Sequence, residues 1–136
     1  MEAGLLLASA CRHPRTALGR KPPTWLRRAT DLLRDRCTEN VSLQEIAREI
    51  GVHPAHLART FRQHHHCTAG DYQRRARIDR ARHLLSMSDD PLVEIALALG
   101  YADQSHFTAA FKRQTGATPG AFRKASRAQS QRSAQT

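Results

Sequence analysis

Two passages of this chain carry side chains that can form two hydrogen bonds to one nucleic-acid base. Arg59 has a guanidinium group, whose parallel N–H donors match the O6 and N7 acceptors of guanine. Gln104 has a carboxamide, which can accept from N6 and donate to N7 of adenine. These residue types predict recognition of base edges. The sequence shows no Gly-rich phosphate loop and no catalytic constellation, so we expect no enzymatic activity.

The run His64-His65-His66-Cys67 is a second concentration of polar and reactive side chains. Adjacent residues on a helix point about 100° apart, whereas metal ligands on one helix usually lie three or four residues apart. Neither a CxxC nor an HExxH spacing accompanies the run. We therefore interpret these residues as the polar end of a helix, near phosphate, and expect no metal ion and no cofactor.

The composition favours a polyanionic partner. Lysine and arginine outnumber aspartate and glutamate by 22 to 12, which gives a net charge of +10 in 136 residues. Such a surplus favours nucleic acid first and an anionic membrane second. The sequence contains no run of about 20 apolar residues, the length that a bilayer-spanning helix requires. The three cysteines are widely spaced and fit a reducing compartment, so we expect a cytoplasmic protein.

These side chains belong to a passage that occurs twice. Residues 46–51 read Ile-Ala-Arg-Glu-Ile-Gly, and residues 95–100 read Ile-Ala-Leu-Ala-Leu-Gly. Beyond each glycine the repeat continues at a spacing of 50, in His56-Leu57 and His106-Phe107, Phe61-Arg62 and Phe111-Lys112, and residues 68–72 and 118–122. The repeat indicates that one supersecondary unit is used twice.

The apolar residues recur at helical spacing throughout, and none alternates as in a strand, so we predict an all-α fold of seven helices. We expect helices from Pro23, from Ser42 to Gly51, from Pro54 to about His65, from Ala69 to about Met87, from Pro91, from Asp103 to Gly116, and a short one from Thr118. In each copy of the repeat a short helix, a glycine turn and a second helix form a helix-turn-helix, the unit whose second helix enters the DNA major groove.

The predicted domain covers residues 23–124, with helix-turn-helix motifs at about 43–64 and 91–114. Residues 1–22 are predicted to be a flexible N-terminal segment, and residues 125–136 a disordered basic tail. The long helix that joins the two motifs should span roughly 28 Å, close to one DNA turn of about 34 Å. One monomer could therefore read two successive major-groove segments.

The helical period also selects the residues that should face DNA. Leu57, Phe61, Phe107 and Phe111 point to the core, so the opposite faces are the candidate reading surfaces. These surfaces comprise Ala55, Arg59, Thr60, Arg62 and Gln63 in the first motif, and Gln104, Ser105, Thr108, Ala109, Lys112 and Arg113 in the second.

Residues 25–124 resemble the DNA-binding domain of the AraC/XylS family of bacterial transcription regulators. The resemblance is most specific in the second motif, from Ile95-Ala96 through Gly100-Tyr101-Ala102-Asp103-Gln104-Ser105-His106-Phe107 to Thr118-Pro119-Gly120-Ala121-Phe122-Arg123. It implies a domain that activates or represses promoters by binding asymmetric double-stranded sites. Members of this family commonly also contact RNA polymerase. We expect a monomer with no membrane association.

The sequence departs from the family pattern at several places. His66 stands where glycine is usual, so the helix should end in a strained cap or run further. Ala76 replaces a large apolar residue, which should thin the core beneath the linking helix, and Ala109 replaces a basic reader found in some relatives. Family members usually carry an N-terminal sensor domain. Residues 4–13 resemble only its last helix, so we expect a truncated or stand-alone domain without an effector site.

Three other functions remain open at this stage. The chain could be a mainly non-specific DNA-binding domain that competes for sites, or a helical protein-interaction module. Some DNA alkyl-repair proteins join a similar helical domain to a reactive cysteine module, which would give Cys11 a role, although no cysteine cluster surrounds it. Preference for one DNA sequence over random duplex would distinguish a regulator from the first two.

Overall fold

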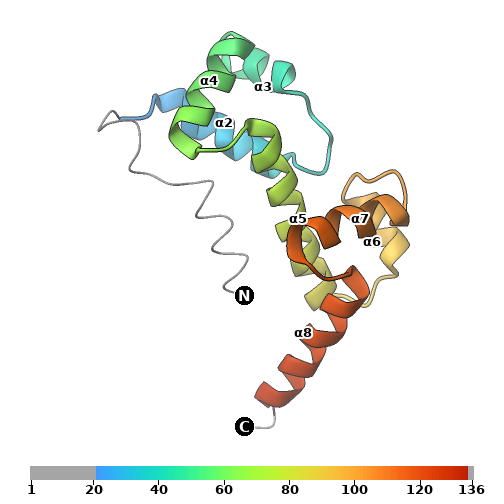
Figure 1. The fold of residues 1–136 in the computed structure, drawn as a ribbon. Coiled ribbons are helices and arrows are strands. Elements are labelled where there is room, and N and C mark those ends of the chain that lie inside the picture. Colours follow the sequence, from blue (N-terminus) through green and yellow to red (C-terminus); the bar gives the residue numbers. More distant parts are fainter. Residues whose placement is uncertain (1–20, 135–136) are drawn as a thin grey trace. The chain divides into compact units, whose positions relative to one another are not determined.

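The regular structure of the described residues is entirely helical. The computed structural model describes residues 21–134, and within them it contains seven α-helices, which confirms the predicted fold class for this part of the chain. The helices are α2 (Thr24–Asp35), α3 (Leu43–Ile50), α4 (Pro54–His65), α5 (Ala69–Met87), α6 (Leu92–Ala98), α7 (Gln104–Thr115) and α8 (Pro119–Ala134) (Figure 1). None of them is long and apolar enough to cross a membrane.

The N-terminal predictions fall largely on residues that the structure does not describe. The proposed flexible segment at 1–22, the sensor-like stretch at 4–13 and Cys11 lie wholly or mostly within residues 1–20. They remain predictions.

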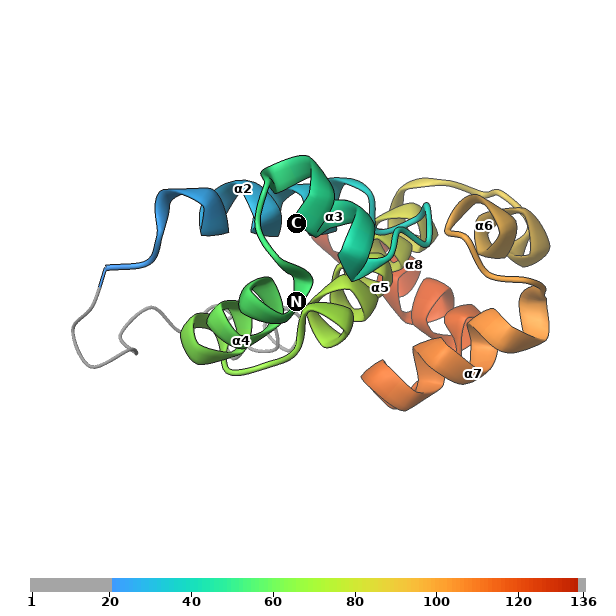
Figure 2. The ribbon, with the colours of Figure 1, turned by 90° about the horizontal axis from the view of Figure 1, so that it is seen from above.

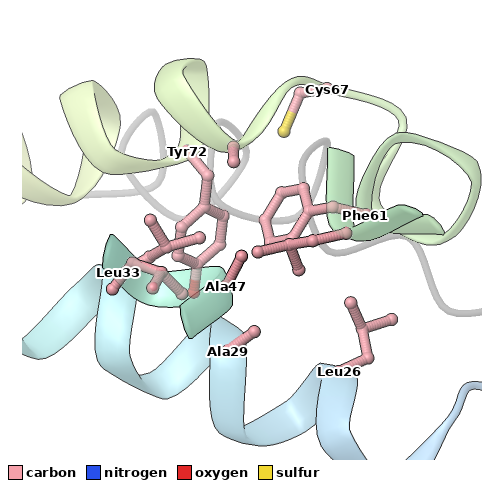
Figure 3. Packing of buried hydrophobic residues seen from close by; sticks show 10 residues of the cluster. Leu26, Ala29, Leu33, Ala47, Phe61, Cys67 and Tyr72 are labelled. Carbon is pink, nitrogen blue, oxygen red and sulfur yellow. The ribbon is translucent and has the colours of Figure 1, made fainter. Parts of the chain in front are cut away.

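The described chain forms two compact units, and their boundary falls between Arg77 and Ile78 inside α5. The first unit is built on α2, α3, α4 and the start of α5. Leu26, Ala29 and Leu33 recur every three or four residues along α2, and all three are buried. They pack in one cluster with Phe61 of α4 and Tyr72 of α5, whose rings meet edge to face at 5.5 Å (Figure 3). The helical spacing of the sequence thus becomes one continuous apolar core.

The second unit has a core dominated by phenylalanine rings. Phe107 and Phe111 of α7 are fully buried, and their centroids lie 5.8 Å apart. Phe111 also meets Phe122 of α8 at 5.5 Å, and both contacts have the edge-on geometry that aromatic pairs prefer. Ile95 and Leu99 of α6 pack in the same cluster. This core holds α7 with its opposite face outward.

One helix contributes to both cores. Tyr72, near the start of α5, is buried in the first cluster, and Ile78, Ala81 and Leu85 are buried in the second. Ala76, which the sequence places at a position usually occupied by a large apolar residue, is only half-buried.

The predicted disordered tail at 125–136 is wrong for its described part, because α8 continues to Ala134. The stretch after Phe122 contains alanine, glutamine, arginine and lysine, which favour helix, and no residue that breaks one. Its first turns are also fixed by contacts within the second unit. Ser126 Oγ lies 2.9 Å from Ser86 Oγ, and the Arg127 guanidinium binds the Asp89 carboxylate. Low hydrophobicity alone was therefore a poor guide to order here.

The end of α4 resolves the question raised by His66. The helix stops at His65, and His66 takes the left-handed conformation with φ of 59°. In the second motif Gly116 occupies the equivalent place after α7, with φ of 85°. Left-handed backbone is costly for a residue with a Cβ atom and almost free for glycine, so the first motif keeps a strained cap where the second does not.

We predict that Gly116→Ala lowers the free energy of unfolding by about 1–2 kcal/mol, because alanine must adopt the left-handed backbone. A Cβ at residue 116 would meet no atom within 4 Å, so the loss would come from the backbone alone. His66→Gly should raise stability by up to about 1 kcal/mol for the converse reason. Urea unfolding followed by circular dichroism measures both changes.

Gly120→Ala serves as the matched control. Gly120 lies in the first turn of α8, its φ is not positive, and a Cβ there also meets nothing within 4 Å. Alanine should therefore be neutral or stabilising by up to about 1 kcal/mol. Equal losses at residues 116 and 120 would contradict the assignment of strain to the cap.

Candidate nucleic-acid interface

The two copies of the repeat fold into the same turn. Gly51 and Gly100 end the short helices in the left-handed conformation, with φ of 90° and 92°. The next residue in each copy reaches back to an alanine carbonyl. Val52 N–H donates to Ala47 O at 3.0 Å, and Tyr101 N–H donates to Ala96 O at 3.0 Å. This six-residue hydrogen bond satisfies an end carbonyl of the helix and fixes the direction in which the chain leaves it.

The same two alanines lie in the buried contact of each helix pair. Ala47 and Ala96 are both 0% exposed, so a larger side chain at either position would have to displace its neighbours. α3 packs against α4, and α6 packs against α7. Figure 2 shows α6 leading through its short turn into α7. Each copy is therefore a helix-turn-helix, as the sequence predicted.

Different side chains cap the second helices. Asp103 Oδ1 accepts from His106 N–H at 2.7 Å and so caps α7, as predicted. α4 is capped by His53, whose Nδ1 accepts from Ala55 N–H at 3.1 Å, and Pro54 takes the first helical position. Sequence reasoning missed His53, although a side chain with an acceptor directly before Pro54 was the available signal.

The outward face of α4 carries most of the residues predicted for it. Ala55, Arg59, Arg62 and Gln63 are exposed. Thr60 is the exception, since it is 7% exposed and belongs to the buried side. It follows Leu57 by three residues and therefore lies only about 60° from it around the helix. We remove Thr60 from the candidate contacts.

The outward face of α7 is hollowed. Five predicted residues line one open surface depression, namely Gln104, Ser105, Thr108, Ala109 and Lys112. Arg113 is exposed one residue further on, and Thr108 is half-buried. The second motif thus presents a carboxamide, two hydroxyls and a methyl group in one place, with cationic side chains at its end.

Neither outward helix contains an acidic residue within its own span, and the nearest carboxylate in the sequence, that of Asp103, is engaged as the cap of α7. The twelve residues of α4 and the twelve of α7 include no aspartate and no glutamate. Six carboxylates elsewhere in the described residues form ion pairs with arginines that lie outside α4 and α7. A hydrogen bond from Arg74 holds the pKa of Asp71 below its usual value, and a hydrogen bond to Glu49 raises the pKa of Arg36. α4 and α7 are therefore suited to a negatively charged partner.

A histidine in the first turn of each outward helix contacts an aromatic ring. His56 of α4 lies against Trp25 of α2, with centroids 5.4 Å apart. His106 of α7 lies against Tyr101 of the preceding turn at 5.3 Å, with the two rings nearly perpendicular. Both histidines are exposed. In both motifs a histidine of the first turn thus contacts an aromatic ring, with interplanar angles of 54° and 86°.

The histidine and cysteine residues of the run from His64 to Cys67 lie at the end of α4 and just after it. No three histidine, cysteine, aspartate or glutamate side chains in residues 21–134 are grouped so that they could hold a metal ion. Cys37 and Cys67 are buried and form no disulfide. His65 is engaged instead with Thr30, whose Oγ1 lies 3.1 Å from its Nε2, and with the ring of Phe61.

Comparison with known proteins identifies the repeated unit. A family described as a helix-turn-helix domain matches residues 46–125, which is more than half of the chain. The HTH-type transcriptional activator RhaS of Escherichia fergusonii is 39% identical over 87 residues, which make up 64% of this chain and 31% of RhaS. A crystal structure of a transcriptional regulator with an AraC-type DNA-binding domain, from Chromobacterium violaceum, superimposes with a TM-score of 0.71.

The chain belongs to the AraC family. The Chromobacterium structure is 29% identical and covers 75% of this chain and 91% of that one. The probable transcription factor PqrA of Proteus vulgaris is 35% identical over 85 residues, or 62% of this chain and 70% of PqrA. The family resemblance inferred from the sequence is thereby confirmed, and residues 46–125 are an AraC-type DNA-binding domain. The chain spans less than a third of the length of RhaS.

The caps of this AraC-type domain generate a stability prediction. Asp103→Ala should lower the free energy of unfolding by about 0.5–2 kcal/mol, because the N–H of His106 loses its acceptor at the start of α7. Asp103→Asn keeps an acceptor oxygen and should retain most of the stability. Thermal unfolding of both variants checks this, and equal losses in both would show that the cap is not the cause.

Proposed function

We propose that this chain is a sequence-specific regulator of transcription that binds double-stranded DNA with α4 and α7 in the major groove. The observation that carries the proposal is the repeated turn, which presents two helices without acidic residues outward. Each helix begins with a side-chain cap and exposes donors suited to base edges or phosphates. Because one chain contains two such helices, we propose that a monomer contacts two segments of the groove.

The two helices should contribute different parts of the specificity. Arg59, at the centre of the exposed face of α4, is the residue we assign to guanine. Gln104, at the start of α7 and on the rim of the hollow, is assigned to adenine. Arg62, Lys112 and Arg113 are assigned to phosphates. Because the outward side chains differ, the preferred site should be non-palindromic.

Membership in the AraC family supports the regulatory role. RhaS is named as a transcriptional activator and PqrA as a probable transcription factor. We extend regulation to this chain as a proposal, together with a cytoplasmic location and a contact with RNA polymerase. The proposal includes no catalytic step.

Selection of bound sequences from a pool of random duplexes tests the proposal. A regulator should enrich one asymmetric sequence and prefer it over random duplex by about a thousandfold or more. A mainly non-specific DNA-binding domain would bind with strong salt dependence and enrich nothing. A protein-interaction module would bind no duplex of the pool.

Arg59→Ala should reduce the preference for the selected site by about 1–3 kcal/mol, with the effect confined to one half of the site. Arg62→Ala is the matched control, because it removes an equal charge from the same exposed helix. It should weaken binding to all sequences alike and reduce the salt slope by about one. Fluorescence anisotropy on selected and scrambled duplexes measures both. If both variants weaken all sequences alike, Arg59 does not read a base.

A further inference from the structure

α4 and α7, the two reading helices, each carry a histidine near their start that the base-reading assignment does not use. His56 precedes Arg59 by three residues, and His106 precedes Ala109 by three. A step of three residues turns a helix by about 300°, so each histidine lies about 60° to one side of the outward centre line. Arg62 follows Arg59 by three residues and therefore lies about 60° to the other side. Lys112 stands in the same relation to Ala109.

Each helix therefore has two polar flanks, and both motifs arrange them alike. A cation occupies one flank, as Arg62 or Lys112, and a histidine occupies the start of the other, as His56 or His106. Gln63 and Arg113 lie further along the flank that the histidines begin. A helix in the major groove lies between two sugar-phosphate backbones, one on each side. A flank that faces a backbone needs donors rather than base-reading groups. Imidazole supplies an N–H donor in its neutral and in its protonated form.

The aromatic contacts give the histidines a defined direction. His56 rests against half-buried Trp25 at 5.4 Å, and His106 rests against buried Tyr101 at 5.3 Å. Each histidine nevertheless remains exposed, so part of its ring faces solvent. A side chain that is already oriented loses less conformational freedom when it binds, and its contact is correspondingly stronger. A histidine–aromatic contact thus occurs in both motifs, although Trp25 belongs to α2 and Tyr101 to the turn before α7.

We infer that His56 and His106 are DNA-backbone contacts, one in each motif, that an aromatic ring orients toward the phosphates of one strand. Arg62 and Lys112 face the other strand. This inference rests on the proposed function and adds to it the second flank of each reading helix.

The competing explanation is that the two histidines only cover the aromatic rings. In that case their removal would affect stability, and any loss of DNA affinity would follow from the loss of folded protein. A readout is therefore needed that depends on a particular phosphate and not on folding.

The first measurement compares His56→Ala and His106→Ala with the unchanged chain on the selected duplex. Each variant should bind about five- to tenfold more weakly, by the same factor on selected and scrambled sequences, because phosphates carry no sequence information. His83→Ala is the control, since His83 is an exposed histidine on α5 outside both reading helices. It should bind like the unchanged chain. Circular dichroism and thermal unfolding establish that each variant is folded.

The second measurement replaces single phosphates of the duplex with neutral methylphosphonates, one position at a time. Neutralising the phosphate that His56 contacts should weaken the unchanged chain but leave His56→Ala unaffected, and a different position should behave so for His106→Ala. An unaltered methylphosphonate profile in folded variants would overturn the inference, as would unaltered affinity. These outcomes differ from a failure of the proposed function, in which the unchanged chain itself would show no preference for any sequence.

Discussion

The hydrogen bond from the residue after the turn glycine to a buried alanine carbonyl is the constraint on which the rest of this domain depends. It forms only if the glycine adopts a positive φ, and it brings two helices together over a side chain no larger than alanine. With the crossing set in this way, Leu57 and Phe61, or Phe107 and Phe111, turn inward. The outward side chains are then placed as a consequence of the turn, not by contacts of their own.

The two motifs satisfy this constraint with different side chains. His53 caps the N-terminus of α4, and His66 follows its last turn with a left-handed backbone. Asp103 and Gly116 have the same roles in α7. Both caps supply an acceptor atom at the right place, and both ends accept the left-handed backbone at different cost. The fold therefore restricts a few backbone-determining positions strongly and leaves the outward faces free to diverge. The two motifs consequently have the same backbone arrangement, while α4 and α7 expose different hydrogen-bonding groups.

Much of this fold could be predicted from the sequence, because the signals were local and repeated. The glycine turns and the four-residue spacing of Leu57/Phe61 and Phe107/Phe111 recur in both copies, and Asp103 is a residue type that commonly caps a helix. Three features escaped prediction for separate reasons. His53 caps a helix although histidine is not a usual cap, Thr60 is buried by its angular proximity to Leu57, and α8 is extended by contacts from Ser126 and Arg127. A periodic sequence pattern does not predict burial at the edge of a helix face, nor contacts between distant segments. The base contacts follow from side-chain chemistry alone, since exposure permits binding without identifying a ligand.

The boundary between the two units has a consequence for how the chain could be divided. It falls between Arg77 and Ile78, within a continuous helix and not in a loop. Arg77 itself is held there, because its Nε donates to Cys37 O at 2.7 Å. A protease needs an extended, accessible backbone, and a hydrogen-bonded helix interior offers none. Cutting at this point would leave Tyr72 with the first core and Ile78, Ala81 and Leu85 with the second, but it would create two new helix ends with unpaired backbone groups. The two units are thus separate in their cores but share one continuous helix, and a gene shortened at this position would encode one unit with an uncapped helix end.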